Sequence, residues 1–162
     1  MSSDGDGHVW TPPAEVLAAG ERASVRYGAP WAMGAGEQAA PSPALVTLAG
    51  ILLHRLRGVP EVGMRRPASR TAEASRFDPH RCGIAADVMI AADADRAARG
   101  DAIANALVTH AEALGVQYVL WSGREWSSSR SGPRWERYTG TNPHRDHVHF
   151  ELGPDARAWS PD

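Results

Sequence analysis

Residues 146–152 read Asp-His-Val-His-Phe-Glu-Leu, a run in which polar and apolar side chains alternate. Side chains at alternate positions of a β-strand point to opposite faces of the sheet. His147, His149 and Glu151 would therefore share one face, while the apolar residues between them pack on the core. This segment predicts a strand that carries two imidazole groups on the face opposite the core.

A second strand is predicted upstream, where residues 84–90 read Ile-Ala-Ala-Asp-Val-Met-Ile. Asp87 is unusual in such a strand, because an unpaired buried carboxylate is costly and needs a partner. His80 precedes the strand by a short loop that contains Gly83, a residue that permits tight turns. If the two strands are adjacent, Asp87 and His149 meet at one point and His80 reaches in from the loop.

Two imidazoles and a carboxylate are ligands that suit Zn²⁺, and three protein ligands leave a coordination position for water. Zinc at such a position lowers the pKa of the water and polarises a carbonyl oxygen. We therefore expect His80, Asp87 and His149 to hold a catalytic zinc ion. Cys82 lies beside His80 and is a fourth candidate ligand, although a small buried core residue is the favoured interpretation.

A hydrolytic site also needs a group that transfers protons to the leaving amine. His147 lies two residues before a predicted ligand and on the same face of the strand, so it is the first candidate. Asp146 and His144 are the alternatives.

The chain has 162 residues, 17 of them basic and 19 acidic, and a net charge of −2. This length suits one domain with a single core. The balanced charge gives no basic surface for nucleic acid, and no run of about 18 apolar residues could span a membrane. We expect neither partner, and we expect a monomer. Cys82 is the only cysteine, which excludes an internal disulfide and favours folding in a reducing compartment.

The pattern of elements predicts an α+β fold with a small, mainly antiparallel sheet and flanking helices. Residues 1–43 are rich in Gly, Pro and Ala and form an irregular arm, with a short helix near residues 13–22. Residues 44–153 form the domain, and residues 154–162 form a short tail. The arm is expected to pack its aromatic side chains against the domain: Trp10, Tyr27 and Trp31. After the arm come predicted helices over residues 45–56 and 101–114, strands over 61–65, 84–90, 116–121 and 146–152, and a loop at 127–132.

The paired motifs, His-x-x-Gly-x-Ala-x-Asp at residues 80–87 and His-x-His at 147–149, resemble those of a known group of zinc peptidases. That group includes D-Ala-D-Ala carboxypeptidases, lysostaphin-type endopeptidases and the hedgehog N-terminal fold. The longer spacing His-x-x-His-x-His at residues 144–149 looks like that of murein endopeptidases, and residues 100–152 resemble secreted bacterial domains of the group. The resemblance covers about residues 44–153 and implies the hedgehog/D-Ala-D-Ala peptidase-like fold.

The resemblance implies the same three zinc ligands and a catalytic role for His147. Asp146 lies three residues before the last ligand, where carboxypeptidase relatives place a catalytic Glu, so it is a competing base. His144 and Arg66 are implied as substrate-binding residues, with Arg65 as the neighbouring alternative. One departure is Asp78, which stands where relatives usually have Ser.

The implied function is a zinc-dependent peptidase that hydrolyses an amide bond in peptidoglycan stem peptides or cross-links. The alternatives are a non-catalytic zinc-containing binding module of the same fold and a zinc N-acetylmuramoyl-amidase. The N-terminal residues lack the basic and apolar regions of a signal peptide. We therefore expect synthesis in the cytoplasm and delivery to a bacterial cell wall by phage lysis or specialised export. Three tryptophans are interpreted as core residues rather than as walls of a substrate groove: Trp121, Trp126 and Trp135.

Overall fold

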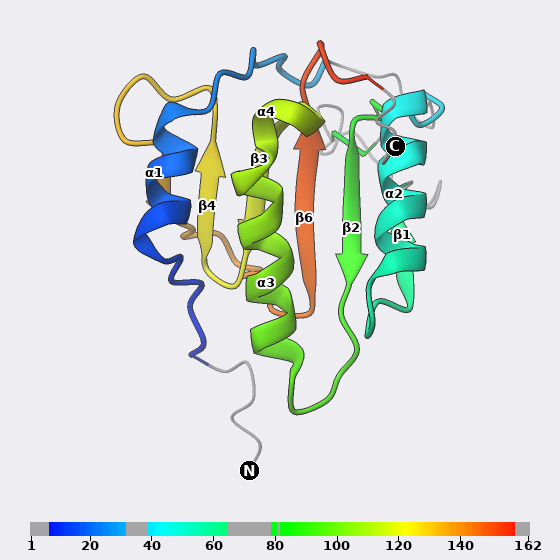
Figure 1. Cartoon of the computed structure of the whole chain (residues 1–162), viewed down its shortest axis with the longest axis vertical. Helices are drawn as coiled ribbons and strands as arrows, with labels where there is room; N and C mark the ends of the chain where they lie inside the picture. Colours follow the sequence, from blue (N-terminus) through cyan, green and yellow to red (C-terminus); the bar gives the residue numbers. More distant parts are fainter. Residues whose placement is uncertain (1–6, 32–38, 65–78, 81, 158–162) are drawn as a thin grey trace.

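The computed structural model describes residues 7–31, 39–64, 79–80 and 82–157. These residues form a six-stranded sheet with strand order β1-β2-β6-β3-β4-β5, in which all neighbouring strands are antiparallel (Figure 1). The predicted small α+β fold with an antiparallel sheet and flanking helices is confirmed. In chain order the elements are α1 (Ala14–Arg22), α2 (Pro43–Arg55), β1 (Glu61–Gly63), β2 (Ala85–Met89), α3 (Arg96–Thr109), α4 (Ala111–Leu114), β3 (Val116–Trp121), β4 (Arg124–Ser127), β5 (Trp135–Arg137) and β6 (His147–Leu152).

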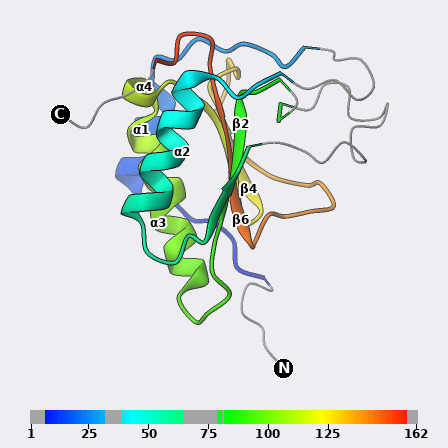
Figure 2. The same cartoon turned by 90° about the vertical axis from the view of Figure 1, so that its right-hand side faces the viewer.

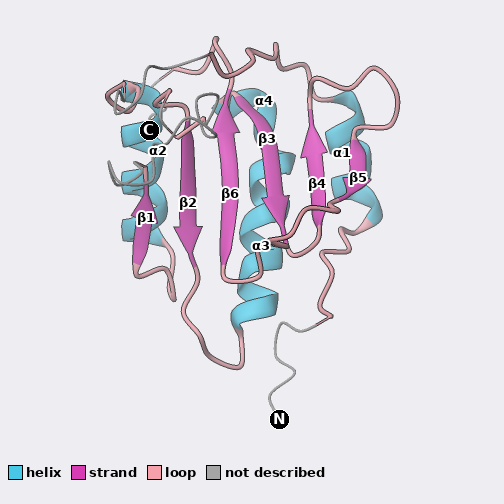
Figure 3. Cartoon of the chain, turned by 180° about the vertical axis from the view of Figure 1, so that it is seen from behind, coloured by secondary structure: helices cyan, strands magenta, loops and turns pink. Residues whose placement is uncertain are grey.

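The helices lie on one face of the sheet and leave the other face to strands and loops, as Figures 2 and 3 show from the side and from behind. Val148 and Phe150 of β6 and Val88 of β2 point toward the helices and are fully buried. The alternation seen in the sequence thus places the apolar residues of these strands in the core. The polar residues between them lie on the face without helices.

Helix α2 begins two residues earlier than predicted, because Ser42 caps it. The Ser42 hydroxyl accepts a hydrogen bond from the backbone N–H of Leu45, and Pro43 occupies the first turn, where its missing N–H costs nothing. The helix ends at Arg55, before Gly58, which has a positive φ. None of the helices in the described ranges is long and apolar enough to cross a bilayer.

The helix predicted over residues 101–114 is wrong in its start and its continuity. Helix α3 begins at Arg96, and His110 separates it from the short α4, which ends at Gly115 as predicted. The first turn of α3 reads Arg-Ala-Ala-Arg and has no large apolar residues at helical spacing, so the sequence pattern missed it. Gly100 lies inside the helix because a Cβ at this position would overlap the ring of Trp121.

Strands β4 and β5 were not predicted. Residues Ser122 and Gly123 connect β3 to β4 in a two-residue hairpin and both have positive φ angles, which is the geometry that such hairpins require. The dipeptide Ser-Gly is a turn signal that could have revealed the hairpin. Trp126 of β4 and Trp135 of β5 belong to the core, as does Trp121, so their interpretation as core residues is confirmed.

The N-terminal arm is part of the same packed structure. Trp10 is fully buried in the main core, and its indole N–H donates to Asn105 of α3 at 2.8 Å. Helix α1 accepts hydrogen bonds at its backbone carbonyls from the indoles of Trp126 and Trp135. The expectation that the arm packs its aromatic side chains against the domain therefore holds for Trp10 and is wrong for Tyr27 and Trp31, which are 36% and 50% exposed.

Candidate metal centre

The register of β2 and β6 brings two of the predicted ligands together. Asp87 and His149 are directly opposite each other across the antiparallel pair, on the face without helices. His80 approaches from the loop before β2, where the backbone N–H of Gly83 donates to the carbonyl of His80 at 3.1 Å. Gly83 has a φ of +76°, and a Cβ there would collide with the carbonyl of Ala40, so this tight turn requires glycine.

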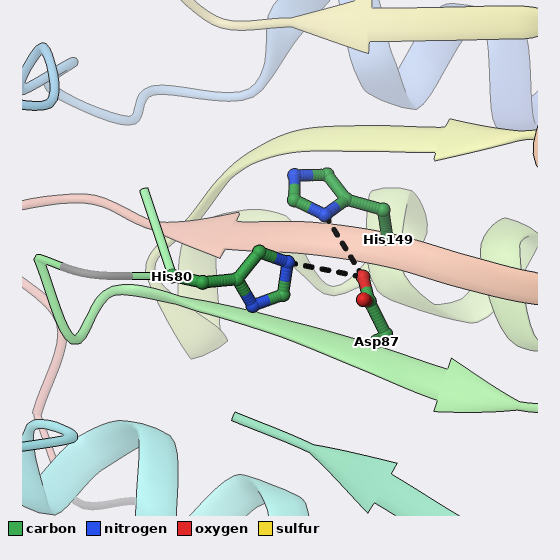
Figure 4. A group of neighbouring side chains, drawn as sticks. All are labelled: His80, Asp87 and His149. Atoms are coloured by element: carbon green, nitrogen blue, oxygen red, sulfur yellow. Dashed lines mark hydrogen bonds and ion pairs between the residues drawn. The ribbon is translucent and has the colours of Figure 1, made fainter. Parts of the chain in front are cut away.

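The three side chains converge on one carboxylate oxygen (Figure 4). The Oδ1 atom of Asp87 lies 3.2 Å from Nε2 of His80 and 3.1 Å from Nδ1 of His149. Each residue offers a ligand atom that lies within 4.8 Å of the other two, and both histidines are buried. The cluster predicted from the sequence therefore exists and could hold a metal ion.

The spacing of these atoms suits a small metal ion. Ligands about 2.1 Å from a tetrahedral zinc ion lie about 3.4 Å from one another. The His80–Asp87 and His149–Asp87 distances of 3.2 and 3.1 Å are close to that value, and all three ligand atoms lie within 4.8 Å of one another, so side-chain shifts would bring them to the ion. Nitrogen and oxygen donors of this kind are also the set that zinc accepts.

Hydrogen bonds within the cluster shift the pKa values of Asp87 and His149 in opposite directions. Burial raises the pKa of Asp87, but hydrogen bonds from His149 and His80 outweigh burial and hold this pKa well below its usual range. Burial lowers the pKa of His149, but hydrogen bonds to Asp87 and to Glu151 outweigh it and raise this pKa to about 9. A metal ion that binds His149 must therefore displace a proton from its ring.

Glu151 is a member of the site that the sequence placed on the correct face but gave no role. Its Oε2 atom lies 3.3 Å from Nε2 of His149, and the residue is 7% exposed. The imidazole of His149 thus lies between two carboxylates, one at each ring nitrogen.

His147 and Asp146 form a pair at the edge of the cluster. Nδ1 of His147 lies 2.7 Å from Oδ1 of Asp146, and Nε2 lies 3.6 Å from Oδ1 of Asp87. Asp146 is largely exposed, whereas His147 is mostly covered. The imidazole therefore faces the candidate metal ligands, and the Asp146 carboxylate lies behind it.

The ring of His144 packs against that of His147, with 4.6 Å between the two ring centroids, and its centroid lies 6.0 Å from that of His149. His144 has a φ of +59°, and its Nδ1–H donates to the carbonyl of Asn142 at 2.6 Å. Burial and the neighbouring His147 lower the pKa of His144 to about 4, so this ring is neutral near pH 7. A neutral ring that donates through Nδ1 presents an acceptor at Nε2.

An open groove of approximately 400 Å³ runs beside the cluster. Arg130 on its wall is held by Glu125 at 2.6 Å and by Glu136 at 3.3 Å. Burial and the nearby Glu125 and Glu151 raise the pKa of Tyr118, which keeps its hydroxyl protonated. The groove is lined by Tyr27, Pro79, His80, Tyr118, Leu120, Ser127, Ser129, Arg130, Tyr138, His144, His149 and Glu151.

Four further residues were singled out in the sequence. Arg65, Arg66 and Asp78 lie outside the described residues. Cys82 is buried, and its thiol donates to the carbonyl of Trp31 at 3.3 Å. Among the described residues it does not belong to the group of candidate ligands, which favours its interpretation as a small core residue.

The fold and the cluster together define a small α+β domain with a candidate metal centre on its open face. A family model described as VldE, C-terminal domain, matches residues 39–149, more than half of the chain, and the chain belongs to this family. The matched region includes all three candidate ligands. No curated protein and no solved structure matched the chain.

Proposed function

We propose that this protein is a zinc-dependent peptidase that hydrolyses an amide bond in peptidoglycan stem peptides or cross-links. The observation that carries the proposal is the convergence of His80, Asp87 and His149 beside an open groove. The resemblance of the paired sequence motifs to those of zinc peptidases supplies the substrate class. The same proposal implies a monomer that reaches a bacterial cell wall.

A zinc ion held by these three residues would supply a Lewis acid that lowers the pKa of a water molecule and polarises the scissile carbonyl. The donor set favours this use, because three protein ligands leave a coordination position open. Glu151 and the backbone of β6 would hold His149 in place while substrate binds from the groove side.

His147 is the proposed proton carrier. Its Nδ1–H donates to Asp146, which leaves Nε2 directed toward Asp87 and the reacting groups. From this position His147 would accept a proton from the attacking water and return it to the leaving amine. Asp146 would orient the ring and stabilise its charged form, as a carboxylate behind a catalytic imidazole does. This geometry favours His147 over Asp146 as the base.

The groove would bind the peptide on either side of the scissile bond. Ser127 and Ser129 present hydroxyl groups there, and Tyr118 and Tyr138 present aromatic faces with a polar end. His144 would accept a hydrogen bond at its Nε2 atom, at the end nearest His147. The groove volume of approximately 400 Å³ suits a few amino-acid residues.

The test is digestion of purified peptidoglycan by the zinc-loaded protein, read by mass spectrometry of the released fragments. We expect cleavage that a chelator abolishes and that zinc restores, with His147→Ala as an inactive, zinc-binding control. Fragments cut between sugar and peptide would instead identify an amidase. Intact peptidoglycan with a protein that binds zinc tightly would contradict the peptidase and favour a binding module.

A further inference from the structure

His149 uses both of its ring nitrogens. Nδ1 lies 3.1 Å from Oδ1 of Asp87, and Nε2 lies 3.3 Å from Oε2 of Glu151. Because Nδ1 faces the atom on which His80 also converges, Nδ1 is the nitrogen that can reach a metal ion. Nε2 then remains with Glu151. Histidine ligands commonly donate their second ring N–H to a carboxylate, which fixes the tautomer and the orientation of the ring.

Glu151 is itself held by a buried amide. Nε2 of Gln117 lies 3.3 Å from Oε1 of Glu151, and Gln117 is fully buried. The same amide nitrogen donates to the carbonyl of Gly28 at 3.0 Å, and the amide oxygen accepts from the backbone N–H of Gly28 at 2.8 Å. Turning the amide over would place donor against donor at Gly28, so its orientation is fixed.

A β-bulge brings Gln117 to this position. Val116 pairs with Leu152, but the next pair along the ladder is Tyr118 with Glu151, so Gln117 is the extra residue on β3. Two residues of β3 therefore oppose Glu151. Bulges beside active sites often redirect a side chain in this way.

The segment around Gly28 belongs to the N-terminal arm and lies tightly against the residues after β6. A Cβ at Gly28 would lie 3.0 Å from Cδ of Pro154, closer than ordinary van der Waals contact. Arg26 of the same segment forms an ion pair with Asp155 at 2.8 Å. The arm is therefore fixed at the point where it contacts Gln117.

We propose that Glu151 is a positioning residue of the metal centre and that Gln117 and the backbone of Gly28 hold it there. Glu151 accepts the Nε2–H of His149 and so directs the Nδ1 lone pair toward Asp87 and His80. The arm thereby contributes to metal binding without supplying a ligand. This inference rests on the metal centre of the proposed function but not on its substrate.

The test is the zinc dissociation constant, measured by competition with a chromogenic chelator at fixed pH, with circular dichroism as the check on folding. We expect Glu151→Ala to weaken zinc binding about 10- to 100-fold. Glu151→Gln keeps an acceptor oxygen, so we expect a smaller loss, up to about tenfold, together with a changed Co²⁺ absorption spectrum. Gln117→Leu should weaken binding in the same direction as Glu151→Ala.

Asp101→Ala is the matched control. Asp101 also pairs with the Nε2 atom of a histidine, His8, at 2.9 Å, but Asp101 lies on α3, on the helix side of the sheet and away from the cluster. Asp101→Ala removes a carboxylate–histidine contact of the same kind, together with the acceptor of the Trp121 indole N–H, so circular dichroism checks its folding as well. We expect its zinc affinity to stay within about twofold of that of the wild type, because remote sites act independently.

Two results would overturn the inference while the proposed function stands. One is tight zinc binding by wild type with an unchanged dissociation constant for folded Glu151→Ala. The other result is a Glu151→Gln protein with wild-type zinc affinity and a wild-type Co²⁺ spectrum. This second result decides the question if Glu151→Ala does not fold. Failure of the wild-type protein to bind zinc would remove the metal centre, and the proposed function would fall with this inference.

Discussion

As pH rises, the metal-free protein should become less stable while zinc binding becomes tighter, because a proton and a metal ion compete for His149. Hydrogen bonds to Asp87 and Glu151 raise the pKa of His149 from 6.5 to about 9 in the folded, metal-free protein. A group whose folded-state pKa is raised stabilises the protein fully below its unfolded pKa and loses that effect as pH rises through the folded value. The metal-free protein should therefore lose stability between pH 6.5 and about 9.

The size of this loss of stability follows from the shift in the pKa of His149. Each pKa unit corresponds to about 1.4 kcal/mol, so the free energy of unfolding should fall by at most about 3 kcal/mol across this window. In a chain of this length that is a decrease in melting temperature of at most about 10 °C. Asp87 does not contribute, because its pKa lies far below the window. Zinc replaces the proton, so zinc affinity should instead rise about tenfold per pH unit up to the same limit.

Thermal denaturation from pH 6 to 9.5, with chelator and with excess zinc, would measure both effects. The variant His149→Gln serves as the baseline, since it removes the titrating group and should show neither slope. A metal-free protein that is equally stable at pH 6.5 and 9, with wild type and His149→Gln behaving alike, would refute the reasoning.

Three further results follow from the geometry. His149→Ala should abolish both zinc binding and peptidoglycan cleavage. His147→Ala should keep its zinc, as measured by metal analysis, and lose about 10²–10⁴-fold in turnover. Full activity of His147→Ala would instead assign the proton transfer to Asp146. Asp146→Asn should reduce kcat by less than His147→Ala does, because the ring remains in place; an equal or larger loss, in steady-state kinetics on soluble muropeptides, would make Asp146 the base. Gly100→Ala should lower the free energy of unfolding by about 1–3 kcal/mol in urea titrations, since its Cβ overlaps the Trp121 ring, and unchanged stability would show that α3 can move.

The sequence was most informative for the strand whose two faces have different roles, one in the core and one in the candidate metal centre. The alternation in residues 146–152 predicted both the core face and the face of the candidate ligands, and the structure places His149 directly opposite Asp87. Strands β4 and β5 were missed because they are short and rich in charged residues, and only their tryptophans pack inward. Apart from the Ser122-Gly123 turn before β4, these strands have no local pattern that separates them from loops.

The contribution of Glu151 could not be predicted, because it depends on contacts between distant parts of the chain. Its partner Gln117 reaches it through a bulge in β3, and Gln117 depends in turn on the backbone of Gly28. A single sequence contains no signal for the position of a bulge. The pairing of His147 with Asp146 was equally hidden, since neighbours on a strand normally point to opposite faces.

The position of β6 has a consequence for how this protein assembles. It is the last strand of the described chain, yet it lies between β2 and β3, which do not pair with each other. Before β6 inserts, both neighbours have an open edge, and neither His149 nor Glu151 is present beside Asp87. Closing the sheet joins residues far apart in sequence, a step that is slow in folding because of its loop-closure entropy. The pairing of β2 with β6 therefore completes both the centre of the sheet and the set of metal ligands, so a chain in which these two strands have not paired has no competent site.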